Sequence, residues 1–306
     1  MALRASGLVV PVAGGRRVAV DDVGDPEGVP VVYLHGTPDS RGSRHPDDAL
    51  ASAAGVRLLA LDRPGYGGTS PLPGGAGDPD WPAVVATDVA AVLDAVGAER
   101  AAVLAWSGGA LAGLAAAAAS GAGGPLGGRV TALSIVGGLA PADAYVDPDV
   151  VAAAPGRHAL VEMGEVVPAG ELGGEVAPLL VPFPCDPALA AEHQAAGRTP
   201  GDAVELRTVA GAAEALALAL AEAVRDGLAG VAADVEAQAR PLPFDLAGVP
   251  CPVRLWYGTA DDVAPAAFGR WLARHLPAAE LTTVPGAGHY LLLTRWRALL
   301  AASAAG

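Results

Sequence analysis

One short stretch constrains the fold of this chain more than any other. Residues 101–113 read AAVLAWSGGALAG: an apolar run typical of a strand, then Ser107, two glycines and small residues that can continue as a helix. This is the strand–serine–helix pattern G-x-S-x-G, in which a tight turn lifts the serine hydroxyl above a sheet edge. Gly109 fits the pattern, and Ala105 departs from it by one methyl group. The pattern predicts a nucleophilic Ser107, with the Gly108 N–H at a helix start, where it can face a developing oxyanion.

Ser-Gly-Gly also occurs in ordinary loops, so this interpretation depends on the strands around it. Apolar runs predict a hairpin of Val9–Val12 with Arg16–Asp21, and further strands at Pro30–Leu34, Arg57–Leu61, Val130–Val136, Pro252–Tyr257 and Glu280–Val284. Helical spacing predicts helices at Trp81–Val96, Ala266–His275 and Tyr290–Leu300. This alternation indicates an α/β fold, a mostly parallel central sheet flanked by helices. Sites in such sheets form beyond the carboxyl ends of the strands, where His35, Asp62 and Ser107 all fall.

The pattern changes after residue 139. Strand signals are scarce over the next hundred or so residues, and the clearest helix is predicted at Ala212–Leu228, with an apolar residue every fourth position. We therefore expect the core to consist of residues 1–139 and 245–306, and residues 140–244 to form a helical cap or lid inserted above the site. The alternative is that the inserted segment is a separate domain with its own function.

Composition limits the classes of partner. The chain has 306 residues, of which 52% are hydrophobic and 17% are charged, enough for a large core. The net charge of −14 argues against nucleic acid and anionic membranes as partners, and leaves a small-molecule substrate. The apolar stretch 101–128 contains eight glycines, a proline and Ser107, so a strand, a turn and a buried helix explain it better than a membrane span.

The N-terminus lacks the pattern of a signal peptide, and we expect a cytoplasmic protein. The two cysteines, Cys185 and Cys251, are far apart and lack the spacing of metal ligands. We interpret them as structural thiols, with a disulfide left open. We expect no metal and no organic cofactor, and the oligomeric state, monomer or homodimer, is open.

Several motifs at predicted strand ends together resemble the α/β-hydrolase superfamily. They are His35-Gly36-Thr37-Pro38, the loop 62–70, the turn at Ser107, Gly258-x-x-Asp261-x-x-x-Pro265 and Gly288-His289. The resemblance covers about residues 8–139 and 245–300, and the order Ser, Asp, His is that of the superfamily. The most similar group is the capped hydrolases, which include proline iminopeptidases and small esterases. The loop His-Gly-Thr-Pro differs from the iminopeptidase sequence His-Gly-Gly-Pro-Gly, which argues against peptidase specificity.

The resemblance implies a catalytic triad of Ser107, His289 and Asp261. In that triad, His289 takes the proton of Ser107 and Asp261 orients the imidazole and stabilises its cation. Asp262 is the neighbouring alternative to Asp261, and the more remote alternatives are Asp143 and Asp147. Asp62 is expected to cap its loop.

The resemblance also implies an oxyanion hole made by the main-chain N–H groups of Thr37 and Gly108. Three further residues are candidates for substrate contact. His35 belongs to the oxyanion loop and is either structural or close to substrate, Trp106 lines the acyl pocket or belongs to the core, and Tyr145 is a candidate for the pocket beneath the cap.

The expected function is that of a serine hydrolase acting, through an acyl-enzyme, on a small, moderately apolar carboxylic ester, lactone or amide. The same fold and triad also serve carbon–carbon bond hydrolysis, lyase chemistry and cofactor-free perhydrolysis, so these reactions stay open as alternatives. A non-catalytic ligand binder is the remaining alternative.

Overall fold

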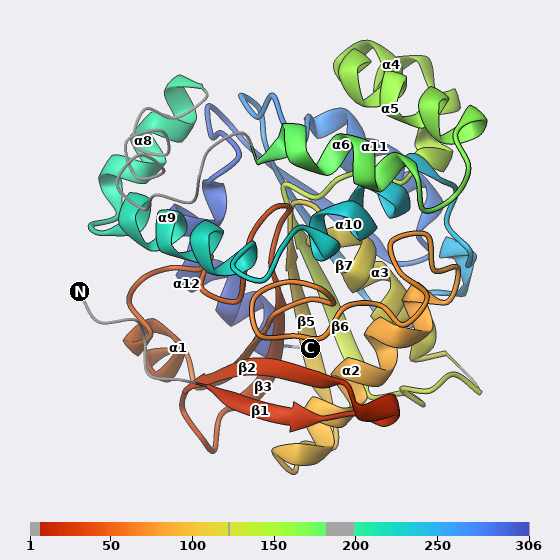
Figure 1. Cartoon of the computed structure of the whole chain (residues 1–306). Coiled ribbons are helices and arrows are strands. Elements are labelled where there is room, and N and C mark those ends of the chain that lie inside the picture. The colour runs from red at the N-terminus through yellow and green to blue at the C-terminus, as the bar shows by residue number, and fades with distance from the viewer. Residues whose placement is uncertain (1–6, 122, 182–198, 306) are drawn as a thin grey trace.

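The computed structural model describes residues 7–121, 123–181 and 199–305, and a twisted sheet runs through its centre (Figure 1). Its strands are β1 (Leu8–Pro11), β2 (Arg17–Gly24), β3 (Val29–Leu34), β4 (Val56–Leu61), β5 (Ala101–Trp106), β6 (Val130–Val136), β7 (Val253–Gly258) and β8 (Ala279–Val284). They lie in the order β1-β2-β4-β3-β5-β6-β7-β8. The six strands β4-β3-β5-β6-β7-β8 pair with their neighbours in parallel. Strand β2 pairs antiparallel with both β1 and β4. The predicted mostly parallel sheet and its N-terminal hairpin are confirmed.

Strand β5 lies near the middle of the sheet, and all six of its residues are buried. A parallel strand that is covered on both faces is expected to read as a continuous apolar run, which is why 101–106 shows no polar alternation. The strand is rich in alanine because the helix that follows packs closely on it. A Cβ on Gly113 of that helix would lie 2.8 Å from the Cβ of Ala105. This close packing fixes the turn that carries Ser107.

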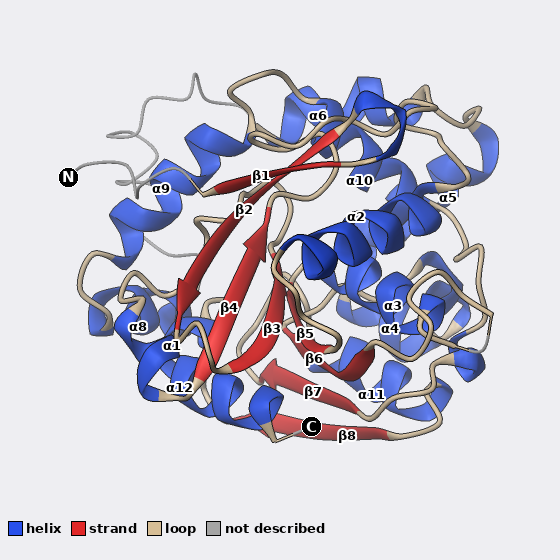
Figure 2. Ribbon diagram, turned by 90° about the horizontal axis from the view of Figure 1, so that it is seen from below, coloured by secondary structure: helices blue, strands red, loops and turns tan. Residues whose placement is uncertain are grey.

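Helices cover both faces of the sheet (Figure 2). One face carries α2 (Trp81–Ala95), α3 (Gly109–Ala119) and α11 (Ala266–His275), and the other carries α1 (Ala49–Ala53) and α12 (Leu291–Ala304). Each set buries apolar side chains against its own face, so the core consists of two layers separated by the sheet. The helices predicted at Trp81–Val96, Ala266–His275 and Tyr290–Leu300 correspond to α2, α11 and α12.

The described elements between β6 and β7 are all helical. They are the 3₁₀ turns Ala142–Val146 and Leu246–Gly248, and the helices α4 (Pro148–Ala153), α5 (Pro155–Val166), α6 (Leu172–Leu180), α8 (Pro200–Thr208), α9 (Ala212–Ala223) and α10 (Ala229–Ala239). A further 3₁₀ turn, Ala13–Gly15, joins β1 to β2. In Figure 1, α6 and α10 lie across one end of the sheet. This helical segment supplies side chains to the site described below.

The prediction of one helix over Ala212–Leu228 is wrong at its end. Helix α9 stops at Ala223, and Leu228 caps the start of α10. Gly227 has φ +116°, a conformation that breaks the helix between them. The apolar spacing continues past this break because Val224 and Leu228 both pack in the cluster around Tyr66. Tertiary packing, and not a continuous helix, therefore produces that part of the pattern.

No helix within the described residues is long and apolar enough to span a membrane. Cys251 is buried, and burial raises the pKa of its thiol. Cys185 lies outside the described residues.

Candidate active site

Ser107 occupies a strained turn between β5 and α3. Its φ of +54° lies in the left-handed region, which a residue with a side chain rarely adopts. The turn is held by hydrogen bonds from the Ser107 N–H to the Val136 carbonyl (3.1 Å) and from the Leu139 N–H to the Ser107 carbonyl (3.1 Å). Gly109 is required after it, because a Cβ there would lie 2.4 Å from the His35 carbonyl oxygen. The expected sharp turn is thus built from local sequence and close packing.

The structure brings Ser107, His289 and Asp261 into one hydrogen-bonded chain. The distance from Ser107 Oγ to His289 Nε2 is 2.9 Å, and that from His289 Nδ1 to Asp261 Oδ2 is 2.9 Å. Because a carboxylate only accepts hydrogen bonds, the fitting tautomer has its proton on Nδ1, and Nε2 accepts from the serine hydroxyl. All three side chains are at least nine-tenths buried. This is the arrangement that activates a serine for nucleophilic attack.

Asp261 is held on its other side by its own loop. Its Oδ1 accepts from the main-chain N–H groups of Val263 and Ala264, both at 2.9 Å. The alternatives lie elsewhere: Asp143 accepts from Leu242 N–H at 2.9 Å, and Asp147 caps α4 and pairs with Arg274. The carboxylate that faces His289 is therefore that of Asp261.

The loop after β3 lies against the serine. A Cβ on Gly36 would be 3.0 Å from the Cβ of Ser107 and 3.4 Å from its Oγ, so a residue without a side chain leaves room there. A Cβ on Gly108 would be 2.1 Å from Thr37 Oγ1, so Thr37 and Gly108 are immediate neighbours. Gly108 precedes α3 directly, where helix N–H groups favour negative charge. The two predicted oxyanion residues are therefore side by side.

His35 is wholly buried and makes contacts within the loops. Its Nε2 accepts from the Arg63 N–H (3.0 Å), and its Nδ1 lies 2.9 Å from the Gly36 carbonyl oxygen. Burial lowers the pKa of His35 well below its usual value, and Arg63 lowers it further, so the ring is neutral. Of the two expectations for this residue, its surroundings match the structural one.

Trp106 and Tyr145 occupy different places. The Trp106 Nε1–H donates to the His289 carbonyl at 3.2 Å, and its ring centroid lies 5.4 Å from that of His289. The indole therefore supports the loop that carries His289, residues 285–290, which is called the base loop below. Tyr145 packs in the core between His158, with parallel rings, and Phe268 of α11.

Sequence reasoning missed a buried polar cluster around Arg63. The Arg63 guanidinium pairs with Asp234 of α10 at 2.5 and 2.6 Å, and the Tyr66 hydroxyl donates to the same carboxylate at 2.6 Å. Although burial alone would lower the pKa of Arg63, Asp234 raises it above its usual value. The motif of residues 62–70 already contains Arg63, but nothing local identifies a partner 171 positions away. Asp62 accepts from the N–H groups of Arg41 and Gly68 and stabilises its loop as expected.

Sequence reasoning also missed Asp202 and Glu205, a pair of buried carboxylates beside His289. Asp202 of α8 is fully buried, and its Oδ1 accepts from the N–H groups of His289 (2.5 Å) and Tyr290 (3.3 Å). Glu205, one turn along, has one carboxylate oxygen that is buried without a hydrogen-bond partner among the described atoms. Burial is the main cause that raises the pKa of Glu205 to about 7, and the nearby charge of Asp202 is the second cause. The spacing Thr199–Asp202 is a readable helix-capping signal, but the contact with His289 is not readable from it.

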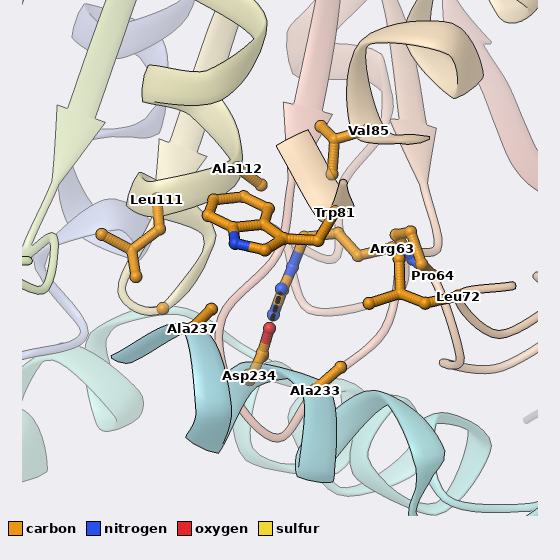
Figure 3. Close-up of a pocket in the computed structure, with 11 residues that line it drawn as sticks. Arg63, Pro64, Leu72, Trp81, Val85, Leu111, Ala112, Ala233, Asp234 and Ala237 are labelled. Carbon is orange, nitrogen blue, oxygen red and sulfur yellow. Dashed lines mark hydrogen bonds and ion pairs between the residues drawn. The ribbon is translucent and has the colours of Figure 1, made fainter. Parts of the chain in front are cut away.

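A small pocket opens beside Gly108 (Figure 3). Its cavity volume is about 30 Å³, enough for roughly two water-sized groups. Most of its lining is apolar and comes from Leu72, Trp81, Val85, Leu111, Ala112 and Ala237. The Trp81 indole stands beside the Arg63–Asp234 ion pair, which forms the polar side of the pocket. Within the described part of the chain, no group of three His, Cys, Asp or Glu residues is arranged to hold a metal ion.

Comparison with known proteins identifies the family to which the fold belongs. A sequence model of the alpha/beta hydrolase family matches residues 31–302. The solved alpha/beta hydrolase fold protein from Nakamurella multipartita is 26% identical, with 98% of this chain and 100% of that chain covered and a TM-score of 0.65. A bromoperoxidase from Bacillus anthracis (18% identity, 97% and 98% coverage, TM-score 0.67) and an esterase from Rhodococcus (21% identity, 98% and 99% coverage, TM-score 0.64) share the fold.

A curated relative matches over a shorter region. The pimeloyl-(acyl-carrier protein) methyl ester esterase of Chromobacterium violaceum is 46% identical over 56 residues, which span 18% of this chain and 20% of that protein. The matched region is therefore about a fifth of each protein.

Proposed function

This chain belongs to the alpha/beta hydrolase family, and on that premise we propose that it is a serine hydrolase that forms an acyl-enzyme on Ser107. Its substrate is a small, moderately apolar carboxylic ester, lactone or amide. The observation that carries the proposal is the hydrogen-bonded chain of Ser107, His289 and Asp261, with both links at 2.9 Å and the serine in a strained turn. Two solved structures with the same fold, the esterase from Rhodococcus and an enol-lactonase from Burkholderia xenovorans, support this reaction class.

In the first step, the Ser107 hydroxyl attacks the carbonyl carbon of the substrate. His289 Nε2 takes the hydroxyl proton as the new C–O bond forms, and then delivers it to the leaving alkoxide or amine. The resulting imidazolium keeps its Nδ1–H on Asp261 Oδ2, whose negative charge stabilises it. Asp261 stays in place because its other oxygen is held by two main-chain N–H groups.

Negative charge develops on the carbonyl oxygen in this step, and we assign its stabilisation to the N–H groups of Thr37 and Gly108. Both residues lie beside the serine, and Gly36 leaves space between the loop and Ser107 Oγ. Removing one such donor typically lowers kcat about 100- to 1000-fold. In the second step, water loses a proton to His289 Nε2 and attacks the acyl carbon. The bond between Ser107 Oγ and the acyl carbon then breaks, His289 returns the proton to Ser107 Oγ, and the acid is released.

The proposed substrate class follows from the lining of the pocket that borders Gly108, the residue after the serine. The pocket beside Gly108 is mainly apolar, and its two charged residues, Arg63 and Asp234, neutralise one another. Such a pocket favours an uncharged, short apolar group next to the reacting carbonyl. We propose that the helical segment 140–244 acts as the cap over this pocket, because α10 contributes residues to its wall.

The proposal is tested with a fluorescent fluorophosphonate, which reacts covalently with an activated serine. The wild type is expected to be labelled, and labelling is expected to vanish in Ser107→Ala and His289→Ala. Ser52→Ala, at an exposed serine, and His275→Gln, at a histidine stacked on Trp271, serve as matched controls and should label normally. A folded wild type that is not labelled would refute the proposal and favour a ligand binder.

Labelling does not identify the bond that is broken. Product analysis with short-chain aryl esters, lactones and diketones distinguishes ester hydrolysis from carbon–carbon bond hydrolysis. We expect turnover of the esters or lactones, with shorter acyl groups preferred. Turnover of the diketones alone would reassign the reaction while leaving the role of Ser107 in place.

A further inference from the structure

Helix α10 reaches into the loop that carries the proposed oxyanion donor Thr37. Asp234 and Gln238 lie one helical turn apart and so share a face of α10. Asp234 Oδ2 accepts the Thr37 hydroxyl hydrogen, and Gln238 Nε2 donates to Thr37 Oγ1 at 3.3 Å. One hydroxyl is thus held from two positions of a helix that is about 200 residues away in sequence.

Asp234 also acts on the backbone of that loop through Arg63. The carboxylate binds the guanidinium through both of its oxygens, at 2.5 and 2.6 Å. The same guanidinium donates to the carbonyl oxygens of His35 (2.9 Å) and Gly36 (2.8 Å). A bidentate pair fixes the plane of a guanidinium, so Asp234 determines where its remaining N–H groups point.

The Gly36 carbonyl belongs to the same peptide unit as the Thr37 N–H. This peptide bond is trans, and in a planar trans unit the C=O and N–H point in opposite directions. Holding the Gly36 carbonyl therefore orients the Thr37 N–H. The unit also lies beside the nucleophile, since a Cβ on Gly36 would be 3.4 Å from Ser107 Oγ.

The ion pair explains why a carboxylate is tolerated so close to an oxyanion site. A free negative charge there would repel the developing oxyanion, but the charges of Asp234 and Arg63 cancel at contact distance. Burial, followed by Asp234, raises the pKa of Tyr66 well above its usual value, so its hydroxyl stays neutral and donates to Asp234.

We propose that Asp234 is a positioning residue of the oxyanion hole, which it orients from the helical segment through Thr37 and Arg63. The catalytic meaning of this assignment rests on the proposed serine hydrolase function. Its physical content is independent of that function. When α10 is docked, the Arg63 and His35 side chains both hold the Gly36 carbonyl, and Asp234 holds the Thr37 hydroxyl. When the Asp234 contacts are lost, the His35 contact is left, so the peptide unit 36–37 is held less tightly.

The first test uses matched substitutions at the hydroxyl. Thr37→Val keeps the branched shape but loses the hydroxyl, whereas Thr37→Ser keeps the hydroxyl. We expect kcat and kcat/KM to fall together by about 10- to 100-fold in Thr37→Val and in Asp234→Asn, because a misplaced oxyanion donor stabilises the transition state less and leaves substrate binding unchanged. Thr37→Ser should recover most of the activity that Thr37→Val loses, because it restores the hydroxyl contacts to Asp234 and Gln238. The double variant Thr37→Val/Asp234→Asn should be no slower than the slower single variant, because the two residues share one contact.

The control is Glu236→Gln on the same helix. Glu236 is a buried carboxylate that pairs with Arg240 and accepts from the N–H groups of Gly170 and Gly173, inside the helical segment. If loss of activity only reflected a loosened helix, Glu236→Gln would lose kcat as well. Should Asp234→Asn not fold, Thr37→Val decides the question alone, since it leaves the Arg63–Asp234 pair intact.

Hydrogen exchange separates this inference from the proposed function. Amides of a peptide covering residues 31–41 should exchange about tenfold faster in Asp234→Asn and Thr37→Val, and at the wild-type rate in Thr37→Ser and Glu236→Gln. Unchanged exchange, or an unchanged kcat in Thr37→Val, would overturn the inference. A wild type that does not react with fluorophosphonate would refute the proposed function, and the exchange rates would still decide whether Asp234 positions the loop.

Discussion

Replacing Asp202 tests whether the helical segment also supports the base loop. Its side chain is fully buried between α8 and the loop that carries His289. One oxygen accepts from His289 N–H (2.5 Å) and Tyr290 N–H (3.3 Å), and the other accepts from Thr199 N–H at 3.0 Å. The loop approaches closely, since a Cβ on Gly288 would be 2.2 Å from Asp202 Oδ1. Asp202→Ala removes all three acceptor contacts at once.

The cost follows from the groups that lose their acceptor. A buried N–H left without a partner costs about 1–3 kcal/mol, and the short His289 contact to a charged oxygen belongs at the upper end. Loss of the contact to Thr199 N–H, which is one half of the capping box, adds about 1 kcal/mol, while Thr199 Oγ1 still accepts from the main-chain N–H of residue 202. Relief of the repulsion between Asp202 and Glu205 offsets part of this sum. We expect the free energy of unfolding to fall by about 3 kcal/mol. We also expect kcat to fall about tenfold, because the 2.9 Å contact between His289 Nε2 and Ser107 Oγ depends on this loop.

Urea unfolding gives the stability change, and initial rates on a short-chain ester give kcat. Asp245→Ala is the matched control, because Asp245 is an exposed helix-capping carboxylate that accepts from Ala247 N–H at 2.9 Å. It should cost about 1 kcal/mol and leave kcat unchanged. A loss of less than about 1 kcal/mol in Asp202→Ala, together with a wild-type kcat, would refute the argument that this carboxylate supports the base loop.

Three further predictions concern neighbouring residues. Because the pKa of Glu205 is about 7 in the folded protein against 4.5 in the unfolded chain, the unfolded chain releases this proton first as pH rises. Between pH 4.5 and 7, the unfolding free energy of the wild type should therefore fall by up to about 2 kcal/mol more than that of Glu205→Gln. The measurement is urea unfolding of both proteins at pH 5 and pH 8, and an equal change between the two pH values in both proteins would contradict the prediction. Gly36→Ala places a methyl group 3.0 Å from the Ser107 Cβ and should lower kcat at least about tenfold with little change in the melting temperature, measured by initial rates and thermal unfolding. Arg63→Lys keeps the positive charge, but a lysine cannot donate to Asp234, His35 and Gly36 at the same time. The unfolding free energy measured by urea titration should therefore fall by about 3 kcal/mol. An unchanged unfolding midpoint would show that the additional hydrogen bonds of the guanidinium do not stabilise the fold.

Sequence reasoning predicts where the side chains lie when their placement depends on local chain geometry. A strand, a sharp turn and a helix put Ser107 at a strand end, and the parallel sheet brings the ends of β5, β7 and β8 to one edge. Asp261 and His289 follow β7 and β8, so their convergence on Ser107 is a consequence of topology that the strand pattern already contains. The same reasoning fails for the end of α9, where packing around Tyr66 continues the apolar spacing beyond the helix.

The contacts made by the helical segment have a different origin. Asp234 meets Arg63 across 171 residues and Asp202 meets His289 across 87, and no local period encodes either pairing. What the sequence does contain is a constraint: an arginine in a loop at a buried strand end requires a carboxylate partner, because an unpaired buried charge is too costly. The constraint defines a set of acidic residues on alanine-rich helices, but selecting Asp234 from that set requires knowing how α10 is docked. The loops that carry Thr37 and His289 are held by two helices of one segment, α10 and α8, so we expect docking of that segment and assembly of the proposed site to be coupled. On the proposed function, we therefore expect this chain to lose activity through substitutions in α8 and α10 that touch neither substrate nor nucleophile.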